Sequence, residues 1–335
     1  MSEWEQAIKY FLTYLPQRIN HWIVVFDRRY HANIVTHLQS ALANSSYLNL
    51  EVVDNSAIRK AEEPNRENEE VGAIIFNMHY HELCNTPMFR LPLSHEALFG
   101  FICWPQHRVK SCIDVSDSHF CDLFSDPPSE VRNACWKLRE QVATCDTLSY
   151  SIRKGEADAL TIGCKGSQWV VFSGFEFDQY ADYVLPTGEI ACMPEYVDGN
   201  IVLDGWIIGT VPFGLKYGRI RRGELELRFQ KGKVVNVNGS NRNLCRDLES
   251  VFDLMPGVQV VTEVGIGQSK AVARLATKQR LGYHWHEPHY GLHLGLGAEL
   301  SDLQDPDERT TGAHLDIVFS SGHLSGYNFG DLLNW

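Results

Sequence analysis

Residues 312–319 read Gly-Ala-His-Leu-Asp-Ile-Val-Phe and place His314 and Asp316 two positions apart within an apolar run. Side chains of a β-strand alternate between its two faces, so this spacing points the imidazole and the carboxylate the same way. Such a pair is half of a metal site or half of an acid–base pair. The simpler alternative is a half-buried strand whose polar face meets solvent. The choice between them depends on residues that lie upstream.

Three upstream segments each place one His or Glu where a strand meets a turn or runs among small residues. They are residues 186–190 with Glu189, residues 261–267 with Glu263, and residues 290–297 with His293. Small neighbours allow a metal or a substrate to approach the backbone closely. With His314 and Asp316 these residues form a mixed oxygen and nitrogen set, which suits zinc, cobalt, manganese or ferrous iron rather than calcium. Each residue taken alone also fits an ordinary turn or strand position.

Composition restricts the class of protein. The 335 residues carry a net charge of −12, which argues against a nucleic-acid partner because phosphate binding requires a basic surface. No apolar run approaches the ~20 residues of a spanning helix, so we expect no membrane partner. The N-terminal residues 1–5 are acidic and lack the features of a signal peptide. The nine cysteines are scattered without a CxxC pair, which favours a reducing cytoplasm over a disulfide framework or zinc knuckles.

The first part of the chain alternates helical and strand patterns. We expect helices at residues 3–15, 32–43 and about 125–149. We expect buried strands at residues 21–27, 48–53, 72–77 and 97–102. This alternation predicts an α/β domain with a mostly parallel sheet. Residues 60–70 are polar and predict a surface loop or a helix with a frayed start.

The pattern changes after about residue 150. Residues 159–162 and 169–172 flank a Lys-Gly-Ser turn and predict a hairpin, and short strands with Gly turns then continue to about residue 235. We therefore expect two domains: an N-terminal α/β domain at residues 1–153, and a C-terminal α+β domain at residues 154–335 that is rich in short strands and carries the metal site.

The order of the motifs is similar to that of a known enzyme family. Pro-x-Gly-Glu, then a Glu beside Gly-Ile-Gly, then His-Leu-x-Leu-Gly, then His-x-Asp resembles the thermophilic-type metallo-aminopeptidases of the aminopeptidase T family. It also resembles their relative 2,5-dihydroxypyridine dioxygenase. The resemblance covers roughly residues 155–320 in motif terms, and the order and spacing of the motifs carry it.

The peptidase resemblance implies two metal ions and a set of ligands. Carried over by motif, the ligands are Glu189, Glu263, His293, His314 and Asp316, and Glu189 and His293 are also the expected catalytic residues. The family's Tyr ligand falls at Leu300, so one expected group is missing here.

The dioxygenase resemblance implies a single ferrous iron. His314 and Asp316 match two members of its two-His, one-Asp triad, whereas the earlier His falls at Glu263. A Glu-His-Asp set argues against ordinary ring cleavage, although the chain length is closer to that of the dioxygenase.

Two His-rich segments are further candidates for substrate binding. His284 and His286 lie in a His-Trp-His-Glu-Pro-His stretch, for which a surface loop is the simpler interpretation and substrate binding or acid–base work the alternative. His79 and His81 follow a predicted buried strand, at the edge where α/β sheets often present binding groups.

Three hypotheses follow for the function. The first is a metal-dependent hydrolase resembling aminopeptidase T, which acts on a peptide or amide-like substrate with narrow specificity and uses zinc, cobalt or manganese. The second is a mononuclear iron dioxygenase acting on an aromatic or heterocyclic substrate. The third is a peptide- or small-molecule-binding protein with weakened chemistry, which needs no metal. For all three we expect a cytoplasmic homodimer without a nucleic-acid partner.

Overall fold

The computed structural model describes residues 1–43, 49–54, 68–78, 108–154, 159–175, 184–297, 313–326 and 330–335. The chain divides into two compact units, each assembled from separate stretches of sequence. Unit 1 comprises Met1–Arg132, Phe172–Gly188 and Lys270–Leu275, and unit 2 comprises Asn133–Val171, Glu189–Ser269 and Ala276–Trp335. The expected division into residues 1–153 and 154–335 stays a prediction.

Unit 1 contains a parallel sheet with the strand order β2-β1-β3-β4. Its strands are β1 (His21–Phe26), β2 (Asn49–Asp54), β3 (Val71–Asn77) and β4 (Val109–Ile113). Five consecutive side chains of β1 are buried, as expected for a strand covered on both faces. The predicted N-terminal α/β domain with its parallel sheet is confirmed.

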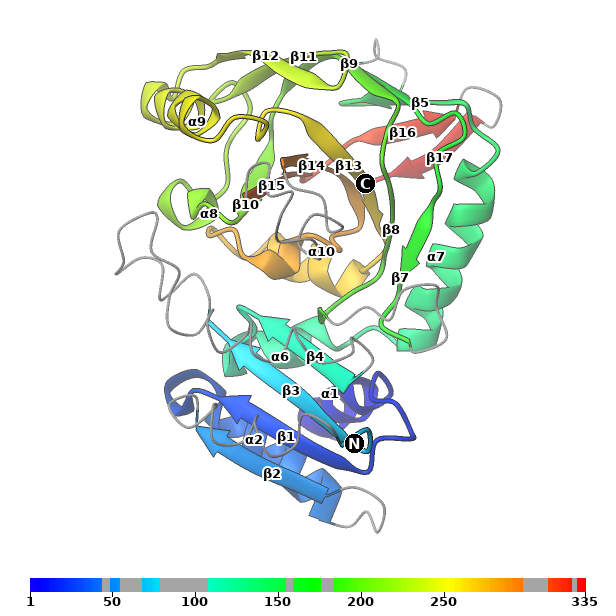
Figure 1. Ribbon diagram of the computed structural model, residues 1–335, viewed down its shortest axis with the longest axis vertical. Coiled ribbons are helices and arrows are strands. Elements are labelled where there is room, and N and C mark those ends of the chain that lie inside the picture. The colour runs from blue at the N-terminus through cyan, green and yellow to red at the C-terminus, as the bar shows by residue number, and fades with distance from the viewer. Residues whose placement is uncertain are drawn as a thin grey trace. The chain divides into compact units, whose positions relative to one another are not determined.

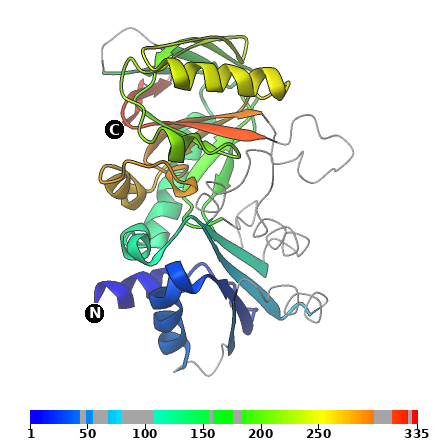
Figure 2. The same ribbon diagram turned by 90° about the vertical axis from the view of Figure 1, so that its left-hand side faces the viewer.

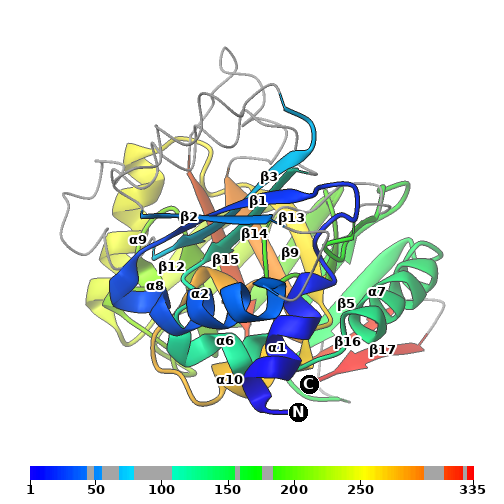
Figure 3. The ribbon, with the colours of Figure 1, turned by 90° about the horizontal axis from the view of Figure 1, so that it is seen from below.

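Three helices of unit 1 lie together on one face of this sheet (Figure 3). They are α1 (Glu3–Leu12), α2 (Arg28–Ala43) and α6 (Asp117–Leu123). Ser2 begins α1 with a capping box, in which the Ser2 Oγ accepts from the Glu5 N–H and the Glu5 carboxylate accepts from the Ser2 N–H. Phe11 of α1 packs against Phe76 and Phe120, which anchors the helices to the sheet. The strand expected at residues 97–102 and most of the polar stretch 60–70 lie outside the described residues.

Unit 2 is built on two antiparallel sheets of short strands (Figure 1). One has the strand order β12-β11-β9-β6-β5-β16-β17. Its strands are β5 (Thr147–Ser151), β6 (Leu160–Gly163), β9 (Tyr196–Val202), β11 (Glu226–Gln230), β12 (Lys233–Asn238), β16 (His323–Gly326) and β17 (Gly330–Asn334). The helix α9 (Arg242–Leu254) packs against β12 at one end of this sheet (Figure 2).

The second sheet of unit 2 has the order β10-β15-β14-β13-β8-β7. Its strands are β7 (Val170–Phe172), β8 (Glu189–Cys192), β10 (Gly205–Gly209), β13 (Val261–Gly267), β14 (Gly291–Gly297) and β15 (His314–Phe319). The other helical elements of the described residues are α7 (Pro128–Val142), α8 (Phe213–Lys216), α10 (Lys270–Ala276) and the 3-10 turn η4 (His284–His286), and Lys270–Leu275 of α10 belongs to unit 1. None of the helices in the described ranges has the length and hydrophobicity required to cross a membrane.

Two predicted elements of this region are wrong. The strands at residues 160–163 and 170–172 do not form a hairpin, because β6 pairs with β5 and β9 while β7 belongs to the other sheet. The predicted helix to about residue 149 ends at Val142, and residues 147–151 form β5 instead. The Thr144 hydroxyl donates to the Gln141 carbonyl in this turn, and such side-chain bonds compete with the continuation of a helix.

The buried His31 of unit 1 makes stability depend on pH. Burial lowers the pKa of His31 to about 4, so the folded protein keeps this imidazole neutral where the unfolded chain takes up a proton. The contribution of His31 to the free energy of unfolding is fully present above about pH 6.5, and up to about 3 kcal/mol is lost as the pH drops toward 4. We expect His31→Gln to remove that part of the pH dependence. Urea unfolding at pH 7.5 and 4.5 gives the difference between the two free energies of unfolding, and His37→Gln in the same helix is the control. If His31→Gln shows the same difference as wild type, His31 is not the source of this pH dependence.

Candidate metal centre

One face of the six-stranded sheet carries the chemistry, and its other face is core. In β14 the residues His293, Gly295 and Gly297 alternate with buried leucines, and in β13 Glu263, Gly265 and Gly267 alternate with apolar residues. The register then sets the neighbours across strands. It pairs Gly265 with His293, Glu263 with Gly295, Gly295 with Asp316, Gly297 with His314, and Gly267 with Glu189. All five predicted ligands therefore share one face.

The side chains of these residues meet at their tips. The His293 Nε2 lies 3.6 Å from the Glu189 Oε2 and 3.7 Å from the Glu263 Oε1. The His314 Nε2 lies 3.9 Å from the Glu263 Oε2 and 2.9 Å from the Asp316 Oδ1, with which it is hydrogen-bonded. Glu263 thus directs one carboxylate oxygen toward each imidazole.

Two glycines, which have no side chain, leave room for the two imidazoles. A Cβ on Gly265 would come within 2.0 Å of the His293 ring, and a Cβ on Gly295 would come within 2.8 Å of both Glu263 and the His314 ring. Any larger residue at either position would displace a member of the cluster. The Gly-Ile-Gly and His-Leu-Gly-Leu-Gly patterns are therefore explained by the need for room above the sheet.

The backbone of His314 is fixed by the end of the neighbouring strand. The Thr210 N–H donates to the His314 carbonyl at 2.8 Å, and the His314 N–H donates to the Thr210 Oγ1 at 2.8 Å. Gly209 precedes this contact with a φ of 118°, and a Cβ there would lie 2.2 Å from the His314 carbonyl oxygen. Only glycine readily combines this conformation with such a close approach.

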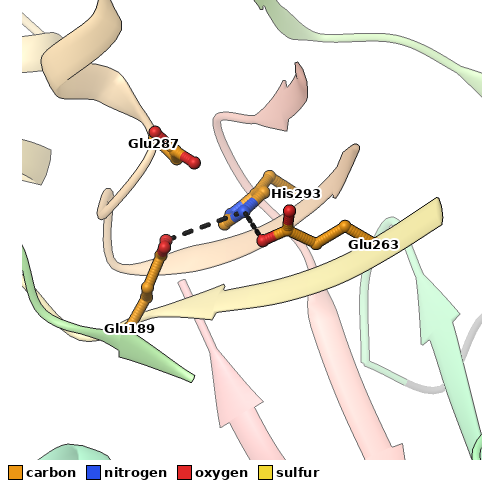
Figure 4. Close-up of side chains that lie close together, drawn as sticks. All are labelled: Glu189, Glu263, Glu287 and His293. Atoms are coloured by element: carbon orange, nitrogen blue, oxygen red, sulfur yellow. Dashed lines mark ion pairs between the residues drawn. The ribbon is translucent and has the colours of Figure 1, made fainter. Parts of the chain in front are cut away.

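Glu287 also belongs to the cluster, and the sequence analysis missed it. One ligand atom from each of Glu189, Glu263, Glu287 and His293 lies within 4.8 Å of the others. Figure 4 shows the three carboxylates approaching the His293 imidazole from different sides. Glu287 follows η4 in the His-Trp-His-Glu-Pro-His stretch, where the histidines draw attention and a single Glu gives no periodic signal.

The other predicted site residues have different outcomes. His286 is completely buried and stacks on Trp285 with 4.1 Å between ring centroids, so a surface loop is the wrong description of this residue. His284 is half-buried at the start of η4. His79, His81 and Leu300, the position of the family's Tyr, lie outside the described residues.

Charges within the cluster influence one another. Burial raises the pKa of the Asp316 carboxyl, but His314, with His293 and His284, outweighs this and holds the pKa below its usual value. The adjacent His289 is also buried, and burial, with a contribution from His293, lowers its pKa to about 4. At neutral pH Asp316 is therefore ionised and His289 is neutral.

The residues present fit a divalent metal. His293 is 1% exposed, and among the described residues neither of its ring nitrogens has a hydrogen-bond partner. Two donors that bind one ion at about 2.1 Å lie about 3.4 Å apart, close to the separations of His293 from Glu189 and Glu263. A mixed carboxylate and imidazole set suits zinc, cobalt, manganese or ferrous iron.

Comparison with known proteins shows which solved structures share this fold. No protein-family model matches the sequence, and no curated protein matches it. Among solved structures, AmpT from Thermus thermophilus aligns with a TM-score of 0.66 and 13% identity over 99% of this chain and 98% of its own. The 2,5-dihydroxypyridine dioxygenase from Pseudomonas putida KT2440 aligns with a TM-score of 0.60 and 12% identity over 98% of this chain and 96% of its own.

The chain has the fold of both enzymes. The similarity expected from the motif order is thereby confirmed at the level of structure. Sequence identities of 12% and 13% do not show which function the chain has, because one fold hosts different reactions.

Substitutions of the two glycines test the arrangement. We expect Gly265→Ala to displace His293, and Gly295→Ala to displace Glu263 and His314, so that each variant retains less metal than wild type. Metal retention after dialysis measures this, and far-UV circular dichroism confirms the fold. Thr262→Ala is the control, since Thr262 adjoins Glu263 in β13 but lies outside the cluster. Full metal retention by both glycine variants would refute the steric argument.

Proposed function

We propose that this protein is a metal-dependent hydrolase of the aminopeptidase T type that holds two divalent ions and acts on a peptide or amide-like substrate. The observation that supports this most is the orientation of Glu263, whose Oε1 faces His293 and whose Oε2 faces His314. A carboxylate divided between two imidazoles is suited to bridge two ions. A mononuclear site would have no use for Glu189 and His293 in the same cluster.

Each ligand has a defined task in this proposal. Glu189 and His293 would hold one ion, His314 and Asp316 would hold the other, and Glu263 would supply one oxygen to each. When bound, the ions act as Lewis acids that polarise a carbonyl group and lower the pKa of water. Asp316 remains ionised because its pKa lies below the usual value.

Proton transfer also requires a group on the protein, and one of the ligands can supply it. Glu189 is our choice, since its Oε2 lies 3.6 Å from the His293 Nε2 and the residue is 8% exposed. The Glu189 oxygen that does not bind the ion would accept a proton from the attacking water and deliver it to the leaving amine. Removing this proton acceptor lowers kcat, so Glu189→Gln should reduce kcat more than it raises KM.

The missing Tyr limits the substrates that we expect. The Leu300 side chain carries no atom that could bind a metal and is more apolar than the family's Tyr. We therefore expect slow turnover of simple leucyl amides and faster turnover of a narrower class of peptide-like or aromatic amides.

A mononuclear iron dioxygenase is the second candidate. The trio of Glu263, His314 and Asp316 is assembled on one sheet face, and the chain shares its fold with a dioxygenase. The replacement of a His by Glu263 and the presence of Glu189 and His293 in the same cluster favour the hydrolase.

Metal analysis of protein purified without oxygen distinguishes the hypotheses. We expect two zinc, cobalt or manganese ions per chain, and hydrolysis of peptide amides that a chelator abolishes and that His314→Ala reduces at least about 100-fold. One ferrous iron with oxygen-dependent turnover of an aromatic substrate would support the dioxygenase instead. No bound metal, with peptide binding insensitive to a chelator, would support the binding protein.

A further inference from the structure

The two halves of the cluster differ in how many donors surround them. Around His293 stand three carboxylates, from Glu189, Glu263 and Glu287, within 4.8 Å of one another and of the imidazole. Around His314 the described residues place Asp316 at 2.9 Å and Glu263 at 3.9 Å. The His293 half therefore offers four donors, counting His293 itself. The His314 half offers three described donors, and it shares one of them, Glu263, with the His293 half.

The halves also differ in what a cation must displace. The His293 ring nitrogens have no hydrogen-bond partner among the described residues, and the side chain is 1% exposed. The His314 Nε2 is already hydrogen-bonded to Asp316, and its side chain is 26% exposed. A cation at His293 gains a buried donor that is otherwise unsatisfied, whereas a cation at His314 must replace an existing hydrogen bond and compete with water.

The position of Glu287 is fixed by packing rather than by chance. The preceding residues are anchored by the His286 N–H, which donates to the Tyr283 carbonyl, and by the stacking of His286 on Trp285. On the other side, the chain lies so close to β13 that a Cβ on Gly267 would meet the His289 carbonyl oxygen at 2.1 Å. A donor held from both sides needs little ordering when it binds an ion, which favours affinity.

We propose that Glu287 completes a four-donor position with Glu189, Glu263 and His293, which binds its ion first and more tightly than the His314 position. Glu287 thus supplies a further acidic donor to the described part of the site. The second ion enters the weaker position after the first has oriented the shared Glu263. This inference rests on the metal site of the proposed function and assigns Glu287 a role that the motif resemblance does not.

Stepwise titration of the metal-free protein with zinc, and with cobalt followed by its visible absorption, tests the proposal. For wild type we expect two binding steps, the first at least about 10-fold tighter than the second. Glu287→Gln should weaken the first step at least about 10-fold. Asp316→Asn should remove the second step and leave the first. Glu249→Gln, which changes an exposed acidic residue of α9, is the matched control and should leave both steps unchanged.

Each failure has a separate meaning. Two equal steps in wild type, or an unchanged first step in Glu287→Gln, would overturn the inference and leave the two-metal site intact. No zinc or cobalt binding by wild type would overturn the proposed function itself. If Glu287→Gln does not fold by circular dichroism, Glu287→Asp replaces it. A first step weaker than wild type then supports the role of Glu287, and wild-type affinity contradicts it.

Discussion

Three carboxylates and two imidazoles share one face of a sheet, the Glu287 carboxylate joins them from the segment after η4, and this concentration of acidic groups is the constraint on which the site depends. Even with both imidazoles protonated, Glu189, Glu263, Glu287 and Asp316 would leave these six groups with excess negative charge. Charge of one sign in a poorly solvated site is costly unless cations compensate it. The glycines of β13 and β14 leave room for the donors, and the packed segment before Glu287 brings its carboxylate to them, so that the group could hold a metal ion.

Several residues of the cluster could be predicted from sequence because their pattern along each strand is local. The spacing of His314 and Asp316 places them on one face of a strand, and the same alternation separates His293 from the buried leucines of β14. Regular apolar runs likewise predicted β1 and β3. Such patterns depend only on the period of a strand, so they survive without knowledge of the fold.

What sequence could not predict depends on pairing between distant segments. The strand β4 was not predicted, because Lys110 interrupts its apolar pattern. Only the fold shows that this Lys is buried and donates to the Gly174 carbonyl. The segments at 160–163 and 170–172 have hairpin spacing, but each finds a better partner elsewhere and they enter different sheets. Glu287 joins the cluster through the course of its segment, which no local pattern encodes.

The central claim is that Glu263 bridges two divalent ions. Anomalous diffraction from crystals soaked in zinc tests it most directly, because the metal positions are located without reference to activity. The account predicts two peaks, one between Glu263 and His293 and the other between Glu263 and His314, with one Glu263 oxygen bound to each. A single peak bound by Glu263, His314 and Asp316 alone, or the absence of any peak in the cluster, would contradict it.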